Sequence, residues 1–131
     1  MAQPVKNIKV LIAEDDQGIC DMYATAFMRE GFKVYTAKDG KIAIEKYYAK
    51  EPDIILLDIM MPEVDGYKVL KEVRSRVDKY VPIIMLTNLD MEHFTRHDSL
   101  DRVDAYLVKC NFTPSEIVSK TKEVLKVNKL I

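Results

Sequence analysis

Side chains able to bind a cation or a phosphoryl group follow short apolar runs at four places in the chain. Glu14 and Asp15 follow the first run, Asp58 ends IILLD, Thr87 ends IIMLT, and Lys109 follows AYLV. Because the carboxyl ends of parallel strands meet at one edge of a sheet, we expect these groups to lie close together. Carboxylates packed so closely repel one another unless a cation lies among them. The pattern therefore predicts a cation site with a hydroxyl and an ammonium beside it.

The chemistry of this predicted site follows from its donor atoms. Oxygen ligands favour a hard ion, and a small, open carboxylate cluster that keeps water ligands suits Mg²⁺. A carboxylate held by such a cation is also a competent phosphoryl acceptor, since the cation and the ammonium neutralise the phosphoryl oxygens. Any one of these residues is equally common as an ordinary loop or cap residue, but the combination at successive strand ends favours a functional site.

The elements that must position these groups are visible in the apolar pattern. Short apolar runs predict strands, and longer segments with helical spacing predict helices between them. This alternation predicts an α/β fold, a doubly wound five-stranded parallel sheet with helices on both faces. Without a linker or a repeat, residues 1–131 are predicted to form a single domain. The expected strands are 8–13, 32–36, 54–57, 81–86 and 105–108, and the expected helices are 16–30, 39–50, 65–76, 91–102 and 114 to about 128.

Composition narrows the possible classes of function. Of the 131 residues, 48% are hydrophobic and 31% charged, and the net charge of −1 argues against a nucleic-acid groove or an anionic membrane surface as partner. The start of the chain lacks the apolar segment of a secretory signal peptide. Cys20 and Cys110 have no metal-type spacing and are expected to be free thiols. We therefore predict a cytoplasmic protein.

The motifs at the strand ends resemble those of a known family. LIAEDD, IILLDIMMPEVDG, IIMLTN and DAYLVK occur in that order, and the stretch around Asp58 is highly specific. Together they resemble the receiver domain of bacterial two-component response regulators, a flavodoxin-like (βα)5 fold, over nearly the whole chain. The resemblance implies a stand-alone phosphorylation switch rather than a turnover enzyme, with Asp58 accepting a phosphoryl group from a histidine kinase or phosphotransfer protein.

The resemblance also implies roles for the surrounding residues. Output in this family passes through the fourth helix, fifth strand and fifth helix, here about residues 91–128, to a partner protein. The chain ends soon after the last predicted helix, so we expect the output to pass through another protein, unless the chain is part of a longer regulator. The implied Mg²⁺ ligands are Asp15, Asp58 and the backbone carbonyl of Met60, with Glu14 acting through water; Thr87 and Lys109 would contact the phosphoryl group, and Tyr106 would be the aromatic switch residue.

The sequence departs from the family pattern near the site. Cys110 stands where proline usually follows the lysine, so we predict a trans bond or a strained cis bond there. Asn88 is larger than the usual small residue and is expected to narrow access to Asp58. Arg102 and Val103 replace the usual Gly-Ala. Met60 and Leu89 are apolar where attacking water would pass, which predicts slow loss of the phosphoryl group.

Three other classes of protein share features of this sequence. A flavodoxin-type carrier must cradle a phosphate in its first strand–helix loop, and the acidic residues there would repel it. A phosphohydrolase usually needs a second acid near the nucleophile, whereas Ile59, Met60 and Met61 follow Asp58. A phosphate-independent receiver-like interaction module stays open because of the departures at Cys110 and Asn88. His93 and His97 have metal-binding spacing but no third ligand, and are expected to be solvated.

Overall fold

The computed structural model describes residues 5–88 and 102–131 of the chain. Residues 1–4 and 89–101 lie outside the described part. The predicted helix 91–102, apart from its last residue, therefore falls outside it, as do Leu89, His93 and His97.

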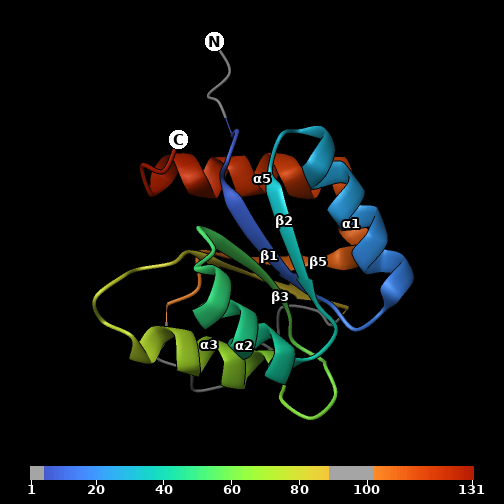
Figure 1. Cartoon of the computed structure of the whole chain (residues 1–131). Helices are drawn as coiled ribbons and strands as arrows, with labels where there is room; N and C mark the ends of the chain where they lie inside the picture. Colours follow the sequence, from blue (N-terminus) through green and yellow to red (C-terminus); the bar gives the residue numbers. More distant parts are fainter. Residues whose placement is uncertain (1–4, 89–101) are drawn as a thin grey trace.

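The elements alternate along the chain as the apolar pattern predicts (Figure 1). The strands are β1 (Lys9–Ala13), β2 (Lys33–Ala37), β3 (Ile54–Asp58), β4 (Ile83–Thr87) and β5 (Ala105–Val108). The described helices are α1 (Gln17–Arg29), α2 (Gly40–Lys50), α3 (Gly66–Ser75) and α5 (Pro114–Val127), together with a short 3-10 turn, η1 (Lys109–Asn111). The turn η1 was not predicted, and β2 and β4 lie one to two residues later than predicted.

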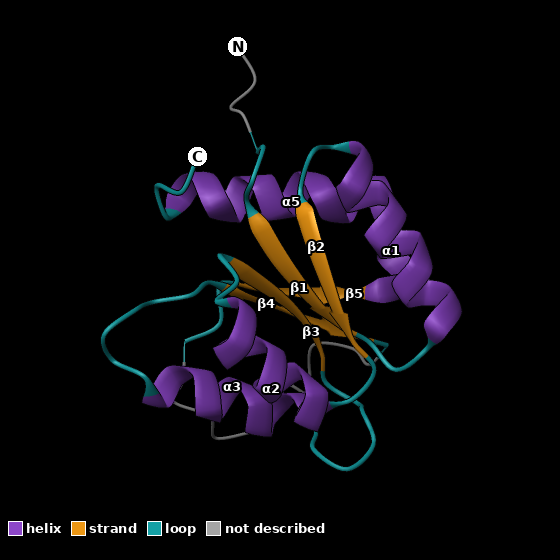
Figure 2. Ribbon diagram, in the orientation of Figure 1, coloured by secondary structure: helices purple, strands orange, loops and turns teal. Residues whose placement is uncertain are grey.

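All five strands are parallel and lie in the order β2-β1-β3-β4-β5, with helices on both faces of the sheet (Figure 2). Alternate strand residues face two separate apolar cores, as the period-two geometry of strands requires. Leu11 and Ile55 lie in the core under α2 and α3, whereas Ile12 and Ile54 lie in the core under α1 and α5. Strands buried on both faces explain the nearly continuous apolar runs. The predicted fold class is confirmed.

Each α-helix in the described part of the chain begins with a capping side chain. Asp16, Asp39 and Asp65 accept hydrogen bonds from the backbone N–H three residues on, at 2.8–3.0 Å. Thr113 caps α5 in a reciprocal pair with Glu116. Because a capping residue keeps extended backbone angles, α1, α2 and α3 begin one residue later than predicted. The caps fix the loops that carry the predicted site.

Candidate functional site

The carboxyl edge of the sheet brings together the groups selected from the sequence. Glu14 directly follows β1, Asp58 and Thr87 end β3 and β4, and Lys109 directly follows β5. The β4–β5 register places Thr87 beside Val108, the residue before Lys109. Asp58, Thr87 and Glu14 are 1–4% exposed and Lys109 is 9% exposed. The strands alone therefore gather two carboxyl groups, a hydroxyl and an ammonium in a buried place.

Lys109 is the centre of this group of charges. Its Nζ lies 3.1 Å from Asp58 Oδ2 and donates a short hydrogen bond to Glu14 Oε1. The other oxygen of Glu14 accepts the backbone N–H of Asp16 at 3.1 Å. One ammonium thus joins two carboxylates from the ends of different strands, and each carboxylate also accepts one backbone N–H. The sequence analysis expected Glu14 to act through water and did not foresee its direct contact with Lys109.

The electrostatics of the site follow from burial and from these contacts. Burial, together with repulsion from Glu14, raises the pKa of Asp58 to about 7, although Lys109 acts in the opposite direction. Burial opposes the charge of Lys109 as well, but the carboxylates of Glu14 and Asp58 outweigh it and raise the pKa of Lys109. A single ammonium therefore does not fully relieve the repulsion between the two carboxylates.

A divalent cation fits this arrangement. One carboxylate oxygen from each of Glu14, Asp15 and Asp58 lies within 4.8 Å of the others, and Asp15 is exposed to solvent. An all-oxygen donor set with one open side is what Mg²⁺ prefers. Met60 lies at the same edge, where its backbone N–H donates to Asp58 Oδ1 at 3.2 Å and its residue surface is 63% exposed. The donor set, and the unrelieved repulsion within it, suit a hard cation.

Two glycines hold the loop after β3 close to its neighbours. A Cβ on Gly66 would lie 2.5 Å from the backbone oxygen of Asp58, and a Cβ on Gly40 would lie 1.9 Å from the backbone oxygen of Val64. Both distances are too short for any side chain, so the loop can pack against Asp58 and α2 only because these residues are glycines. The sequence analysis missed both. The available signal was the repeated Asp-Gly pair, a capping aspartate followed by a glycine at the first helical residue.

The positions that depart from the family pattern have clear places in the structure. The described residues contain no cis peptide bond, so Lys109–Cys110 is trans, one of the two predicted outcomes. Cys110 lies in η1 and is exposed, as is Asn88. Tyr106 is half-buried and packs against the core under α2 and α3. Tyr106 therefore lies on β5, and Cys110 lies in the turn that follows this strand, one residue after Lys109.

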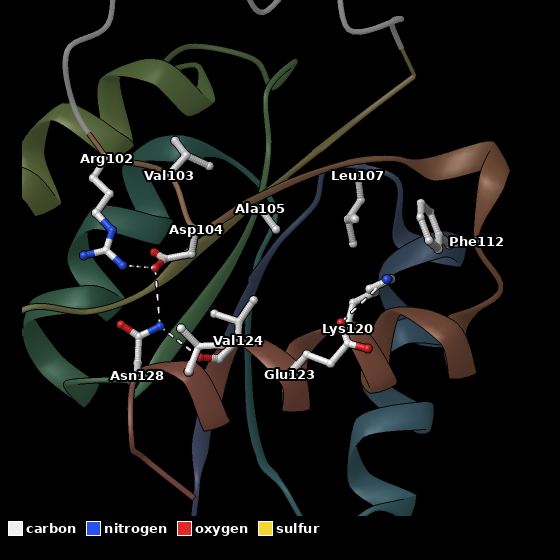
Figure 3. Close-up of a pocket in the computed structure, with 11 residues that line it drawn as sticks. Arg102, Val103, Asp104, Ala105, Leu107, Phe112, Lys120, Glu123, Val124 and Asn128 are labelled. Atoms are coloured by element: carbon white, nitrogen blue, oxygen red, sulfur yellow. Dashed lines mark hydrogen bonds and ion pairs between the residues drawn. The ribbon is translucent and has the colours of Figure 1, made fainter.

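A groove of about 430 Å³ runs between β5 and α5 (Figure 3). Arg102, Asp104 and Asn128 lie at one end of it, and Phe112 and Lys120 lie toward the other. Between these ends, the apolar Ala105, Leu107 and Val124 line the groove together with the charged Glu123. It occupies part of the surface that the sequence analysis assigned to a partner protein.

A buried carboxylate closes the groove at the end remote from Asp58. Asp104 accepts hydrogen bonds from Tyr80 Oη at 2.8 Å and from the Ile83 backbone N–H at 2.9 Å. It also contacts Arg74, Arg102 and Asn128 at 3.3–3.5 Å. The Asp104 cluster, as we call these six residues, joins α3 and β4 to the residue directly before β5 and the residue directly after α5. The sequence analysis did not single it out, because its members are far apart in the chain.

Comparison with known families agrees with this geometry. The family model for the response regulator receiver domain matches residues 10–122. This chain belongs to that family. The receiver domain is therefore part of a two-component signalling system, as the motifs around Asp58 imply.

Related proteins extend the comparison. The receiver domain is 30% identical to the chemotaxis response regulator CheY4 of Vibrio cholerae, with a TM-score of 0.82 over 92% of this chain and 100% of that one. It is 32% identical to the receiver domain of Francisella response regulator 1452, with a TM-score of 0.77 over 93% and 99% of the two chains. The probable transcriptional regulator ycf27 of Guillardia theta is 39% identical over 90% of this chain. The receiver domain spans only 45% of that relative's length.

No helix within residues 5–88 and 102–131 combines the length and the apolar character needed to cross a bilayer.

Proposed function

We propose that this receiver domain is a phosphorylation switch in which Asp58 accepts a phosphoryl group from the phosphohistidine of a sensor histidine kinase or a phosphotransfer protein. The observation that carries the proposal is the contact of one buried ammonium, Lys109, with both Asp58 and Glu14 beside the exposed Asp15. This arrangement provides a nucleophilic carboxylate, a fixed cation and a set of oxygen ligands in one place.

In the proposed transfer, an Asp58 oxygen forms a bond to phosphorus while the bond from phosphorus to the imidazole nitrogen breaks, and the nitrogen keeps the electron pair. Asp58, Asp15 and the Met60 carbonyl would hold Mg²⁺, with Glu14 supporting it. When bound, Mg²⁺ would favour the ionised form of Asp58 and neutralise charge on the transferred group. Lys109 would supply a second positive charge to the phosphoryl oxygens.

The switch itself is a shift in population. A phosphoryl group on Asp58 adds nearly two negative charges and three acceptor oxygens beside Thr87 and Lys109. Any arrangement of the end of β4 that lets the Thr87 hydroxyl donate to those oxygens gains stability, and Tyr106 on the adjacent strand would move with it. The proposed switch acts stoichiometrically, without turnover of a substrate.

The output of the switch would be a protein. The groove between β5 and α5 lies within the surface assigned to partner binding and is lined by both apolar and charged side chains. The net charge of −1 supplies no excess of positive charge for nucleic acid or anionic lipid. We therefore expect the β5–α5 surface, with the predicted fourth helix, to bind a partner protein in a phosphorylation-dependent way.

The deciding experiment is incubation with acetyl phosphate, with and without Mg²⁺, followed by intact mass measurement. We expect a single phosphoryl adduct that requires Mg²⁺ and is lost in Asp58→Asn. Asp53→Asn is the matched control, because Asp53 directly precedes the other end of the same strand and accepts the Lys9 backbone N–H there. If a folded, Mg²⁺-binding protein gives no adduct, the proposal is wrong and the phosphate-independent interaction module replaces it.

A further inference from the structure

Arg102 stands where the family usually has a glycine, and the structure gives its side chain a defined position at the surface. The guanidinium lies over the ring of Tyr80, with Cζ 4.8 Å from the ring centre, and contacts Asp104 Oδ1 at 3.3 Å. Tyr80 is itself fixed, because Arg74 Cζ lies 4.3 Å from the centre of the same ring and the Tyr80 hydroxyl donates to Asp104 at 2.8 Å. A planar guanidinium held on an aromatic ring in this way loses little freedom when it binds a further group.

Most of the hydrogen-bonding capacity of Arg102 is open to a partner. Its side chain is 62% exposed, whereas that of Asp104 is 4% exposed. Within residues 5–88 and 102–131, the guanidinium donates one hydrogen bond, to Asp104, and its other N–H groups face no acceptor. A guanidinium with free N–H groups suits a carboxylate, which it can bind through two parallel hydrogen bonds. A partner that approaches this place therefore meets a positive charge, because the neighbouring carboxylate is buried.

The exposed guanidinium lies at one end of the groove between β5 and α5 (Figure 3). Asn128, at this end, follows Lys120 by eight residues, so the groove extends about 12 Å along α5. Val124 and Val127 line it between these positions, and Val127 is 76% exposed although it is apolar. Apolar side chains flanked by charged ones are the usual composition of a protein interface.

The charges around the groove favour an acidic partner. Residues 102–131 contain six lysine or arginine residues and three acidic ones, in a chain whose net charge is −1. At the end remote from Arg102, Lys120 pairs with Glu123 at 3.6 Å, and 44% and 67% of these side chains are exposed. Such an exposed pair is weak, so Lys120 can contact a carboxylate of a partner at little cost. The groove thus combines apolar side chains with a local excess of positive charge.

We propose that the groove between β5 and α5 binds a short acidic and apolar segment of a partner protein. The segment places an aspartate or glutamate carboxylate on Arg102 and an apolar side chain against Val124 and Val127. About two turns of helix, or about four extended residues, span the groove. Because the inference names the occupant of the output surface, it rests on the proposed function in that respect. The groove and Arg102 are nevertheless present in the resting protein, where binding can be measured.

The test selects displayed random peptides on the wild-type protein, once without metal and once with Mg²⁺ and beryllofluoride, an inert mimic of the phosphoryl group. We expect enriched peptides to combine an acidic residue with apolar ones and to bind Arg102→Gln about tenfold more weakly, the effect of one lost charge-assisted hydrogen bond. Arg29→Gln is the matched control, because Arg29 is an exposed residue of α1 and lies beside Ser115 and Ser119 rather than in this groove. Enriched peptides without an acidic residue, equal affinity for wild type and Arg102→Gln, or equal losses in the two variants overturn the proposal.

The apolar part of the proposal has its own variant. Val127→Ser should weaken binding of the same peptides about fivefold, because an apolar side chain of the peptide loses its contact. Val77→Ser is the control, since Val77 is 95% exposed in the loop after α3 and should leave the affinity unchanged. Wild-type affinity in Val127→Ser contradicts the apolar contact. A peptide of the same composition in scrambled order that binds equally well shows a nonspecific attraction of charges and contradicts the whole proposal.

The two selections separate a failure of this inference from a failure of the proposed function. Peptides that depend on Arg102 but bind both states equally support the groove and contradict its control by Asp58. If the protein forms the phosphoryl adduct at Asp58 but neither state enriches a peptide, the phosphoryl transfer stands and the inference about the groove is wrong. If no adduct forms, the binding of peptides to the metal-free protein still decides whether the groove takes an acidic segment.

Discussion

At the scale of single residues, the site is defined by an excess of acidic groups over basic ones. Lys109 contacts two buried carboxylates, and Asp15 adds a third acidic group at the open side. The types of these residues and their convergence could be predicted from the sequence, because parallel strands share a carboxyl edge. The pairing of Lys109 with Glu14 could not be predicted, because these residues are 95 positions apart and several carboxylates were equally available as partners. The role of Asp104 could not be predicted for the same reason: its surroundings exist only after folding.

The raised pKa of Asp58 predicts that its ionisation destabilises the metal-free fold. The pKa of this carboxyl is about 7 in the folded protein, against an ordinary value of 3.8. The protonated group therefore contributes stability that is complete below the lower value and is lost as the pH rises through the higher one. Asp58→Asn should therefore be more stable than wild-type protein at pH 8 without Mg²⁺, by a few kcal/mol at most, and the difference should shrink by pH 5. Urea unfolding in a chelating buffer at both pH values measures this. A variant that is less stable than wild type at pH 8 contradicts the prediction.

Met60 gives a second prediction at this scale. Its side chain is exposed beside the acceptor, and an apolar group there offers no hydrogen bond to an attacking water molecule. On the proposed function, Met60→Asn should shorten the lifetime of the phosphoryl group by about tenfold, the effect of one well-placed polar contact. Decay of the adduct after removal of acetyl phosphate, followed by intact mass, measures it. The matched control is Met28→Asn, which changes an equally exposed methionine on α1; equal decay in wild-type, Met60→Asn and Met28→Asn proteins would rule the idea out.

At the scale of elements, most strands and helices could be predicted because buried parallel strands leave apolar runs and helices leave a regular spacing. The predicted helix starts were one residue too early at Asp16 and Asp65. These aspartates cap their helices with extended backbone angles, so each helix begins at the following residue. The turn η1 was missed because its residues carry no apolar period. Close backbone contacts, such as those at Gly40 and Gly66, depend on how the loops pack and not on local pattern.

Substitution of Gly66 tests the close packing of the loop after β3. A Cβ at Gly66 would overlap the backbone of Asp58 and Ile59, at 2.5 and 2.8 Å, so either the loop or the end of β3 must move. We expect Gly66→Ala to lower the free energy of unfolding by about 2–3 kcal/mol. Gly18→Ala is the matched control, because a Cβ there meets only the Asp16 side chain at 3.4 Å, and alanine should stabilise α1 by up to about 1 kcal/mol. Equal effects of the two substitutions in urea unfolding would contradict this account of the loop.

At the scale of the whole molecule, the two ends of the sheet have different organisation. The carboxyl edge holds charges that attract a cation, whereas the amino edge of β4 and β5 is fixed by the Asp104 cluster. The family and the fold class followed from motifs and alternation, which extend over nearly the whole chain. The Asp104 cluster could not be predicted in this way, because it joins four elements through side chains that have no local signature.

Removal of the Asp104 carboxylate should cost about 3 kcal/mol of stability. Asp104→Ala would leave the Tyr80 hydroxyl, the Ile83 N–H and the Arg74 guanidinium without their buried acceptor. Asp78→Ala is the control: Asp78 pairs with Arg76 at the surface, with 67% of its side chain exposed, and its loss should change stability by less than about 0.5 kcal/mol. Thermal and urea unfolding compare the two variants, and equally small effects would show that the Asp104 cluster does not hold the elements together.

The Asp104 cluster also determines how far a disturbance at the site can move β5. The strand is fixed at Asp104 and ends beside Lys109, so its four residues form a lever arm of about 13 Å. A rotation of about 5° about the fixed end displaces the Lys109 end by about 1 Å and leaves the Asp104 end in place. The displacement therefore grows along the groove between β5 and α5, because Asp104 lies at its fixed end and Phe112 lies toward the other end, after Lys109. A partner bound at the Phe112 end would therefore experience the full displacement of β5, whereas a partner bound only beside Asp104 would experience almost none.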